Sequence, residues 1–204
     1  MAVRNLFVLL AFVLAFFSRV GAEAVDRSFD KYTLNSGDAT KFKSDGQIVY
    51  NSTSTGKSGW VMYKQCDSRW AGQQLGYCSE TICSAGCAMT SVAMMLKTKG
   101  AGVDPASLDS YLTTHGGYAN GCNIIWARAD DFGVTQFRSI QVASYNEICN
   151  GLSQNHGIIA NVNNGGHWVL LTGCAGNGNF YVNDPGYNRN TYSIGEISQE
   201  AVYW

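Results

Sequence analysis

The segment SAGCAMTSVAMML, residues 84–96, indicates the fold most clearly. After Gly86, apolar side chains recur with a helical period until Gly100, which predicts a buried helix with Cys87 in its first turn. A thiol at a helix N-terminus experiences the positive end of the helix dipole, which lowers its pKa and favours the nucleophilic thiolate. Cys87 is therefore a candidate nucleophile, and Gly86 would let a substrate backbone approach it. The alternative is a structural cysteine, either buried or disulfide-bonded.

Further helix and strand signals surround this segment. Asp104-Pro105 offers an N-cap acid and a first-turn proline, Ser144–Glu147 is a capping box, and residues 123–132 are expected to form another helix. Short β-rich runs separated by Gly and Asn follow at residues 157–162, 167–172 and 179–183. Helical patterns that precede strands indicate an α+β fold, in which the helix after Cys87 packs on a small C-terminal antiparallel sheet.

A histidine and an acid lie at the ends of two predicted strands. His167 follows a Gly pair and begins an apolar run, which would hold its ring on a rigid sheet beside a cleft. Asn183 and Asp184 end the next strand, and because successive strand residues face opposite sides, only one can address the imidazole. We choose Asp184, since a carboxylate on one ring nitrogen allows the other nitrogen to take the thiol proton. Taken singly, each residue also fits an ordinary role, as an interfacial histidine and a turn-forming aspartate.

The composition excludes several classes of protein. The 14 Lys and Arg nearly balance the 15 Asp and Glu of the 204 residues, and no basic stripe recurs, so we expect no nucleic-acid partner. Charged residues make up 14% and hydrophobic residues 46%, which indicates a folded domain rather than a disordered chain.

The N-terminus has the features of a secretory signal peptide. Arg4 precedes the unbroken apolar run Leu6–Phe17, which is shorter than the roughly 18 to 20 residues that a membrane span needs. Small residues at Ala22 and Ala24 would permit cleavage. We therefore expect a signal peptide over residues 1–22 and a secreted or lumenal mature chain with no membrane partner; a signal anchor is the alternative.

Residues 23–60 form a polar stretch between this signal and the patterned part of the chain. They contain the N-glycosylation sequon Asn51-Ser52-Thr53, which would suit an exposed position. We interpret the stretch as an arm or pro-segment that precedes a domain at residues 61–204, and we hypothesise that it covers the cleft until it is cut.

From about Val61 onward, the chain resembles the C39-like members of the papain-like cysteine peptidase superfamily. The resemblance rests on four motifs in the family's order: YKQCDSRW (63–70), GC (86–87), GHWV (166–169) and NDPG (183–186). It implies a papain-like fold and a peptide or protein substrate. It also implies a nucleophile, a general base, an orienting acid and an oxyanion-hole donor, at Cys87, His167, Asp184 and Gln65 respectively.

Three functions remain open on this evidence. A cysteine peptidase would hydrolyse peptide bonds through an acyl-enzyme, whereas an acyl transferase would replace water with an amine. An inactive, disulfide-bridged binding or effector module would keep only the fold. The state of Cys87 separates them, because an enzyme needs this thiol unpaired. The oligomeric state stays open.

The seven cysteines bear on that question. All lie in the expected mature chain, where an oxidising environment favours disulfides, so three bridges would leave one thiol. Pairing cannot be deduced from the sequence; one bridge that we suggest joins Cys149 to Cys174.

A metal site is the remaining alternative. Cys83 and Cys87 are four residues apart, but no paired Cys-x-x-Cys knuckles occur, and His115 and His156 lack an acidic partner at a suitable spacing. We expect no metal and no cofactor, and we interpret these histidines as a loop residue and a helix-terminal residue.

Overall fold

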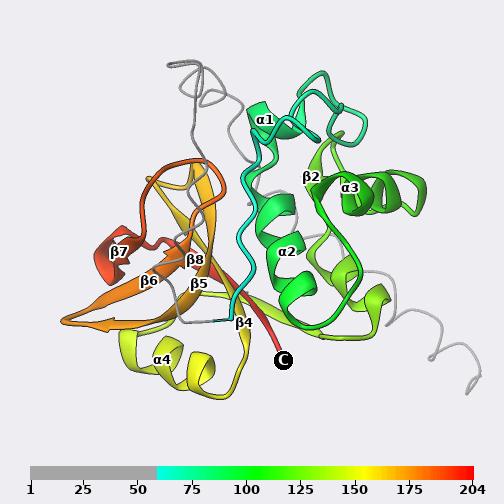
Figure 1. The fold of residues 1–204 in the computed structure, drawn as a ribbon. Coiled ribbons are helices and arrows are strands. Elements are labelled where there is room, and N and C mark those ends of the chain that lie inside the picture. Colours follow the sequence, from blue (N-terminus) through cyan, green and yellow to red (C-terminus); the bar gives the residue numbers. More distant parts are fainter. Residues whose placement is uncertain (1–58) are drawn as a thin grey trace, which may run out of the picture. The chain divides into compact units, whose positions relative to one another are not determined.

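The buried helix predicted after Gly86 is the central element of the computed structural model, which describes residues 59–204 (Figure 1). This helix, α2, spans Cys87–Thr98 and is buried without interruption from Cys87 to Leu96. A short helix, α1 (Ile82–Ala85), precedes it. The expected signal peptide, the sequon and the arm up to residue 58 lie outside the described residues. Within the described part, no helix is both long and apolar enough to traverse a bilayer.

Two further helices begin where local capping signals predicted them. Helix α3 (Pro105–Thr114) follows Asp104, whose carboxylate accepts a hydrogen bond from the backbone N–H of Ser107. Helix α4 (Tyr145–Ser153) follows Ser144, whose hydroxyl accepts one from the backbone N–H of Glu147. The predicted N-cap and capping box are thus confirmed.

A six-stranded antiparallel sheet forms the other part of the fold, in the order β3-β8-β4-β5-β6-β7. Its strands are β3 (Phe137–Gln141), β4 (Gly157–Val162), β5 (His167–Gly176), β6 (Asn179–Asn183), β7 (Thr191–Ser193) and β8 (Gln199–Tyr203). A 3-10 turn, η3 (Ile194–Glu196), separates the last two. The combination of helices and an antiparallel sheet confirms the α+β class. The predictions for β4 and β6 are confirmed in full, whereas β5 extends beyond Thr172.

The prediction of a helix over residues 123–132 is wrong for the first residues of that range. Asn123–Ile124 forms β2, which pairs with β1 (Tyr118–Ala119). The physical reason is the turn between them, where Asn120 and Gly121 have positive φ values of 48° and 88° and reverse the chain. A 3-10 helix, η2, then runs from Trp126 to Phe132.

The prediction that strands follow the helices also needs correction. Strand β3 precedes α4 in the sequence, and within residues 59–204 its one partner is β8, which comes from the C-terminus. Half-buried and exposed side chains do not alternate regularly along β3, as suits an edge strand. Its sequence therefore carries no clear period-two pattern of apolar residues.

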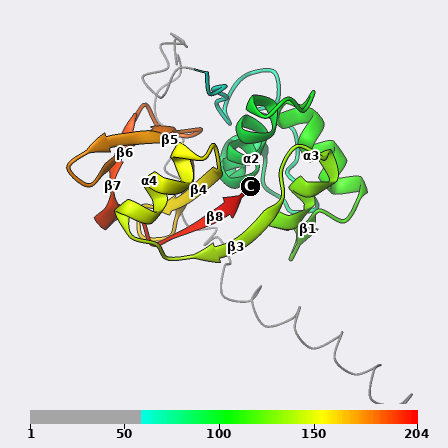
Figure 2. The ribbon, with the colours of Figure 1, turned by 90° about the horizontal axis from the view of Figure 1, so that it is seen from below.

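Helices cover both faces of the sheet. Ile159 and Leu170 belong to the same apolar cluster as α2, whereas the adjacent Ile158 and Leu171 belong to the cluster that contains α4 residues. Strand β4 is consequently buried at every position. Figures 1 and 2 show α2 between the sheet and α3, so α2 is held by apolar contacts on two sides.

One buried carboxyl group lies within this packing. Glu200 on β8 is 1% exposed, and neither of its carboxyl oxygens has a hydrogen-bond partner among residues 59–204. Burial raises the pKa of Glu200 to about 7 from the usual 4.5, although nearby Gln141 and the Ala143 backbone oppose the shift. Because the folded state binds this proton more tightly than the unfolded state, stability falls as pH rises from 4.5 through about 7.

We therefore predict that Glu200→Gln stabilises the protein at pH 8 and has a smaller effect at pH 5, since the amide has no charge to bury. Thermal unfolding of both proteins at the two pH values measures this. An equal difference in Tm at pH 5 and pH 8 would contradict it.

Candidate active site

Cys87 is the first residue of α2, and its sulfur is in no disulfide. The side chain is 6% exposed. No side chain within residues 59–204 caps the helix at Gly86, and the first turn contains no acidic residue. The N-terminal backbone N–H groups of α2 and the positive end of its dipole are therefore available to a negative charge on or near the sulfur.

The structure explains the glycine at position 86 differently from the expectation that it admits a substrate backbone. A Cβ atom built at this position would lie 2.5 Å from the carbonyl oxygen of Ile82, inside any normal contact. Glycine is therefore required because α1 and α2 meet here almost without a linker. The interpretation that Gly86 admits a substrate backbone is not needed to explain it.

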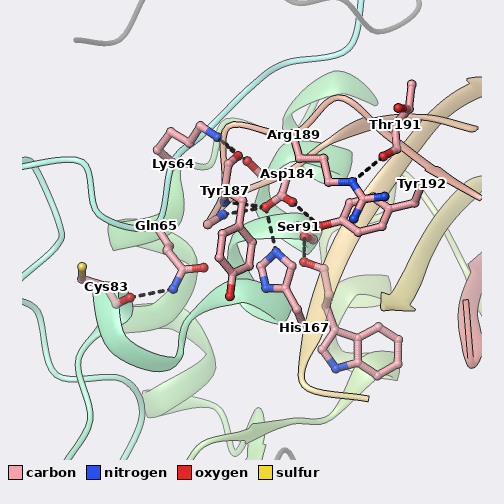
Figure 3. Close-up of polar contacts among 12 residues, drawn as sticks. Lys64, Gln65, Cys83, Ser91, His167, Asp184, Tyr187, Arg189, Thr191 and Tyr192 are labelled. Carbon is pink, nitrogen blue, oxygen red and sulfur yellow. Dashed lines mark hydrogen bonds and ion pairs between the residues drawn. The ribbon is translucent and has the colours of Figure 1, made fainter. Parts of the chain in front are cut away.

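His167 begins β5 and is 1% exposed. Its Nε2 lies 2.7 Å from Oδ1 of Asp184, and the Tyr187 ring packs edge-on at a centroid distance of 5.0 Å (Figure 3). Burial alone would lower the pKa of His167, but hydrogen bonds with Asp184 and with Cys87 outweigh it and raise that pKa to about 9. The same imidazole thus interacts with both the candidate nucleophile and the candidate acid.

Asp184 is completely buried and is surrounded by donors. Besides His167, the backbone N–H groups of Gly186 and Tyr187 donate to Oδ1 at 2.9 and 2.8 Å, and the Tyr192 hydroxyl donates to Oδ2 at 2.9 Å. Burial would raise the pKa of Asp184, but the His167 hydrogen bond and charge, together with the backbone donors, hold it below its ordinary value. Asp184 is therefore a carboxylate at neutral pH.

The two polar residues at the end of β6 diverge as strand geometry requires. Asp184 addresses His167, whereas the Asn183 amide donates to the carbonyl oxygen of Val61 at 2.9 Å.

Gln65 is also completely buried, close to α1. Its side-chain Nε2 donates to the carbonyl oxygen of Cys83 at 2.6 Å, and its backbone N–H donates to the carbonyl oxygen of Pro185 at 3.0 Å. The side-chain oxygen has no partner among residues 59–204. One of the two amide hydrogens is thus used internally, which leaves the second for another acceptor.

Lys64 contributes to the site although the sequence gave no sign of it. Its ammonium group donates to the carbonyl oxygens of Asp184 and Tyr187 at 2.7 and 2.6 Å (Figure 3). Burial lowers the pKa of Lys64, and the nearby Asp184 charge opposes this. Lys64 and the Gln65 backbone together fix the turn that carries the acid. Tyr192, from β7, was also missed: the Lys64 contact joins residues 120 positions apart, and the Tyr192 contact depends on how β7 returns beside the turn that carries Asp184.

The disulfide pairing of the cysteines agrees only partly with the expected pairing. The suggested Cys149–Cys174 bridge is present, and a second bridge joins Cys66 to Cys83 beside Gln65. The expected third bridge is absent from the described residues, where Cys78, Cys87 and Cys122 are all unpaired.

The other two histidines and one pocket of the described residues lie apart from this location. Residues 59–204 contain no group of three His, Cys, Asp or Glu side chains suited to a metal ion. His115 is exposed and stacks on Tyr111, and His156 lies beside the Trp204 ring. A pocket elsewhere is lined by β3, α4 and β8, and none of the four candidate site residues borders it.

Comparison with known proteins identifies the family. Residues 61–204 match the model of the Peptidase_C39 like family. A crystal structure of a candidate C39-like peptidase from Bacillus anthracis aligns with 73% of this chain and 96% of its own, at 16% identity and a TM-score of 0.47. No curated protein matches the chain. Because the family model covers the whole segment that carries Gln65, Cys87, His167 and Asp184, the chain belongs to the Peptidase_C39 like family.

Proposed function

We propose that this protein is a secreted cysteine peptidase of papain-like architecture that hydrolyses peptide bonds with Cys87, His167, Asp184 and Gln65. One observation carries the proposal: the unbridged sulfur at the start of α2 interacts with an imidazole that a buried carboxylate holds from its other side. Membership of a peptidase family implies a peptide or protein substrate.

We propose that the resting site holds a protonated His167 imidazole beside the Cys87 sulfur. Because Nε2 of His167 bonds to Asp184, Nδ1 is the nitrogen that meets the Cys87 sulfur. A His167 pKa of about 9 means that the imidazole holds a proton at neutral pH, and the α2 dipole favours the negative sulfur. Asp184 keeps the ring orientation and stabilises its positive charge.

Hydrolysis then proceeds in two halves. The Cys87 sulfur attacks the substrate carbonyl carbon, and His167 gives its proton to the leaving amine as the C–N bond breaks. This leaves a thioester between Cys87 and the acyl part of the substrate. In the second half His167 takes a proton from water, the resulting hydroxide attacks the thioester, and the acid product leaves as the thiolate returns.

Each tetrahedral intermediate carries an oxyanion that needs donors. We assign this role to the backbone N–H of Cys87, at the uncapped start of α2, and to the second amide hydrogen of Gln65. Removing one such donor typically costs about 3 to 4 kcal/mol of transition-state stabilisation.

Export and domain layout complete the proposal. Two disulfides fit an oxidising compartment, and we propose a signal peptide at residues 1–22, an arm at 23–60 and the peptidase domain at 61–204. An acyl transferase that used the same four residues would differ only in that an amine, not water, accepts the acyl group. An inactive binding module would lack a reactive Cys87.

Replacement of the nucleophile tests the chemistry directly. We predict that Cys87→Ser lowers kcat on a fluorescent protein substrate by about 10⁴-fold or more, because the hydroxyl is a far weaker nucleophile at neutral pH. Iodoacetamide near pH 6 should inactivate the wild type and label Cys87. A wild type that neither cleaves substrate nor reacts with iodoacetamide, yet is folded by circular dichroism, would favour the inactive module.

Replacement of the acid tests the ion pair. Wild-type activity should decline as pH rises through about 9, where the His167 imidazolium loses its proton. We predict that Asp184→Asn moves this decline to lower pH, because the neutral amide no longer stabilises the imidazolium, and lowers kcat by about 10²- to 10⁴-fold. NMR titration of the His167 ring gives its pKa in both proteins. Unchanged His167 pKa values would contradict the assigned role of Asp184.

Lys64 offers a test of positioning. We predict that Lys64→Met lowers kcat by about 10- to 100-fold with little change in KM, because the turn that carries Asp184 shifts relative to His167. Lys64→Arg should restore part of the loss, and the matched control Lys97→Met, at an exposed lysine of α2, should behave as the wild type. A lower Tm without any change in kcat or in the pH profile would show that Lys64 serves stability alone.

A further inference from the structure

Two of the unpaired cysteines lie outside the candidate active site, on segments that the fold brings together. Cys78 lies in the loop before α1, and Cys122 lies between β1 and β2. Both are half-buried and pack against the main apolar cluster. Neither contributes to the proposed chemistry, so their pairing can be considered independently of the proposed function.

We propose that Cys78 and Cys122 form a third disulfide in the oxidised protein. The backbone N–H of Tyr77 donates to the carbonyl oxygen of Gly121 at 2.8 Å, so the residues directly before the two cysteines are already hydrogen-bonded. A Cβ atom built on Gly121 would lie 3.4 Å from Cys78 Cβ and 3.7 Å from Cys78 Cα. The backbone of Gly121, the residue before Cys122, is therefore in contact with Cys78. Disulfides join residues whose Cα atoms are about 4.4 to 6.8 Å apart, a separation that a residue adjacent to such a contact can reach.

The two side chains also interact with each other. A hydrogen bond with the Cys78 thiol and, above all, burial raise the pKa of Cys122 to about 12. The Cys78 thiol in turn donates to the carbonyl oxygen of Leu75 at 3.1 Å. Two thiols in mutual contact need a rotation of their side chains, not a movement of the backbone, to reach bonding geometry.

The reaction is an exchange with a small-molecule or protein disulfide. Cys78 and Cys122 each lose a hydrogen and their sulfurs join, while the oxidant's S–S bond is reduced to two thiols. Because exchange begins from a thiolate and burial disfavours that form at Cys122, the bridge should form slowly without a catalyst and faster at alkaline pH.

The bridge would have a defined structural effect. It would join the loop that leads into α1 to the β1–β2 hairpin, in addition to the Cys66–Cys83 bridge that holds the other end of that loop. It would also leave Cys87 as the single unpaired cysteine of the seven.

A thiol map of the full mature chain tests this. The protein is incubated with oxidised glutathione at pH 8.5, alkylated with iodoacetamide under denaturing conditions and digested without reduction. Trypsin together with a Glu-specific protease cuts after Glu80 and so separates Cys78 from Cys83 and Cys87. Mass spectrometry should find residues 70–80 linked to the peptide with Cys122, two hydrogens lighter than the separate peptides, and neither Cys78 nor Cys122 should be alkylated.

The Cys122→Ser variant is the matched control, in which the cross-link disappears and Cys78 is alkylated. Alkylation of both Cys78 and Cys122 in the oxidised wild type, with Cys66–Cys83 and Cys149–Cys174 intact, would overturn the proposal. Separate glutathione adducts on the two cysteines would overturn it as well, since they would show that each thiol meets the oxidant but not its neighbour.

Discussion

The hydrogen bond between His167 Nε2 and Asp184 Oδ1 is the interaction on which the candidate site depends. It joins the start of β5 to the turn after β6, and both groups are almost completely excluded from solvent. A buried carboxylate is costly unless donors surround it, and the Tyr192 hydroxyl and two backbone N–H groups supply them. The arrangement therefore fixes the imidazole and its charge together.

A second constraint is the position of α2. Apolar contacts with the sheet on one side and with α3 on the other leave this helix little room to shift, and the absence of space for a Cβ at Gly86 fixes its start against α1. The sulfur of Cys87 is thereby held at the helix terminus, where the dipole acts on it. The acyl transfer that we propose requires a nucleophile and a base held in fixed positions.

Much of this could be predicted from local sequence. The α2 pattern, the caps at Asp104 and Ser144, and strands β4 and β6 each depend on neighbouring residues, and all were anticipated. The β1–β2 hairpin was missed because the helix-like apolar spacing that follows it was given more weight than its own turn signal, the Asn120-Gly121 pair, in which both residues have positive φ. Edge strand β3 was missed because its partner, β8, is about sixty residues away in the sequence.

The sequence by itself determined which chemical groups the site contains: a cysteine at a helix start, a histidine at a strand start, an acid after a strand and an odd number of thiols. Only the tertiary structure decided which of them meet. Lys64 and Tyr192 reach Asp184 through hydrogen bonds across 120 and 8 residues, and Cys78 approaches Cys122 through packed loops. Such contacts arise from packing, which depends on the whole chain, whereas caps and periodicity depend on a few adjacent residues.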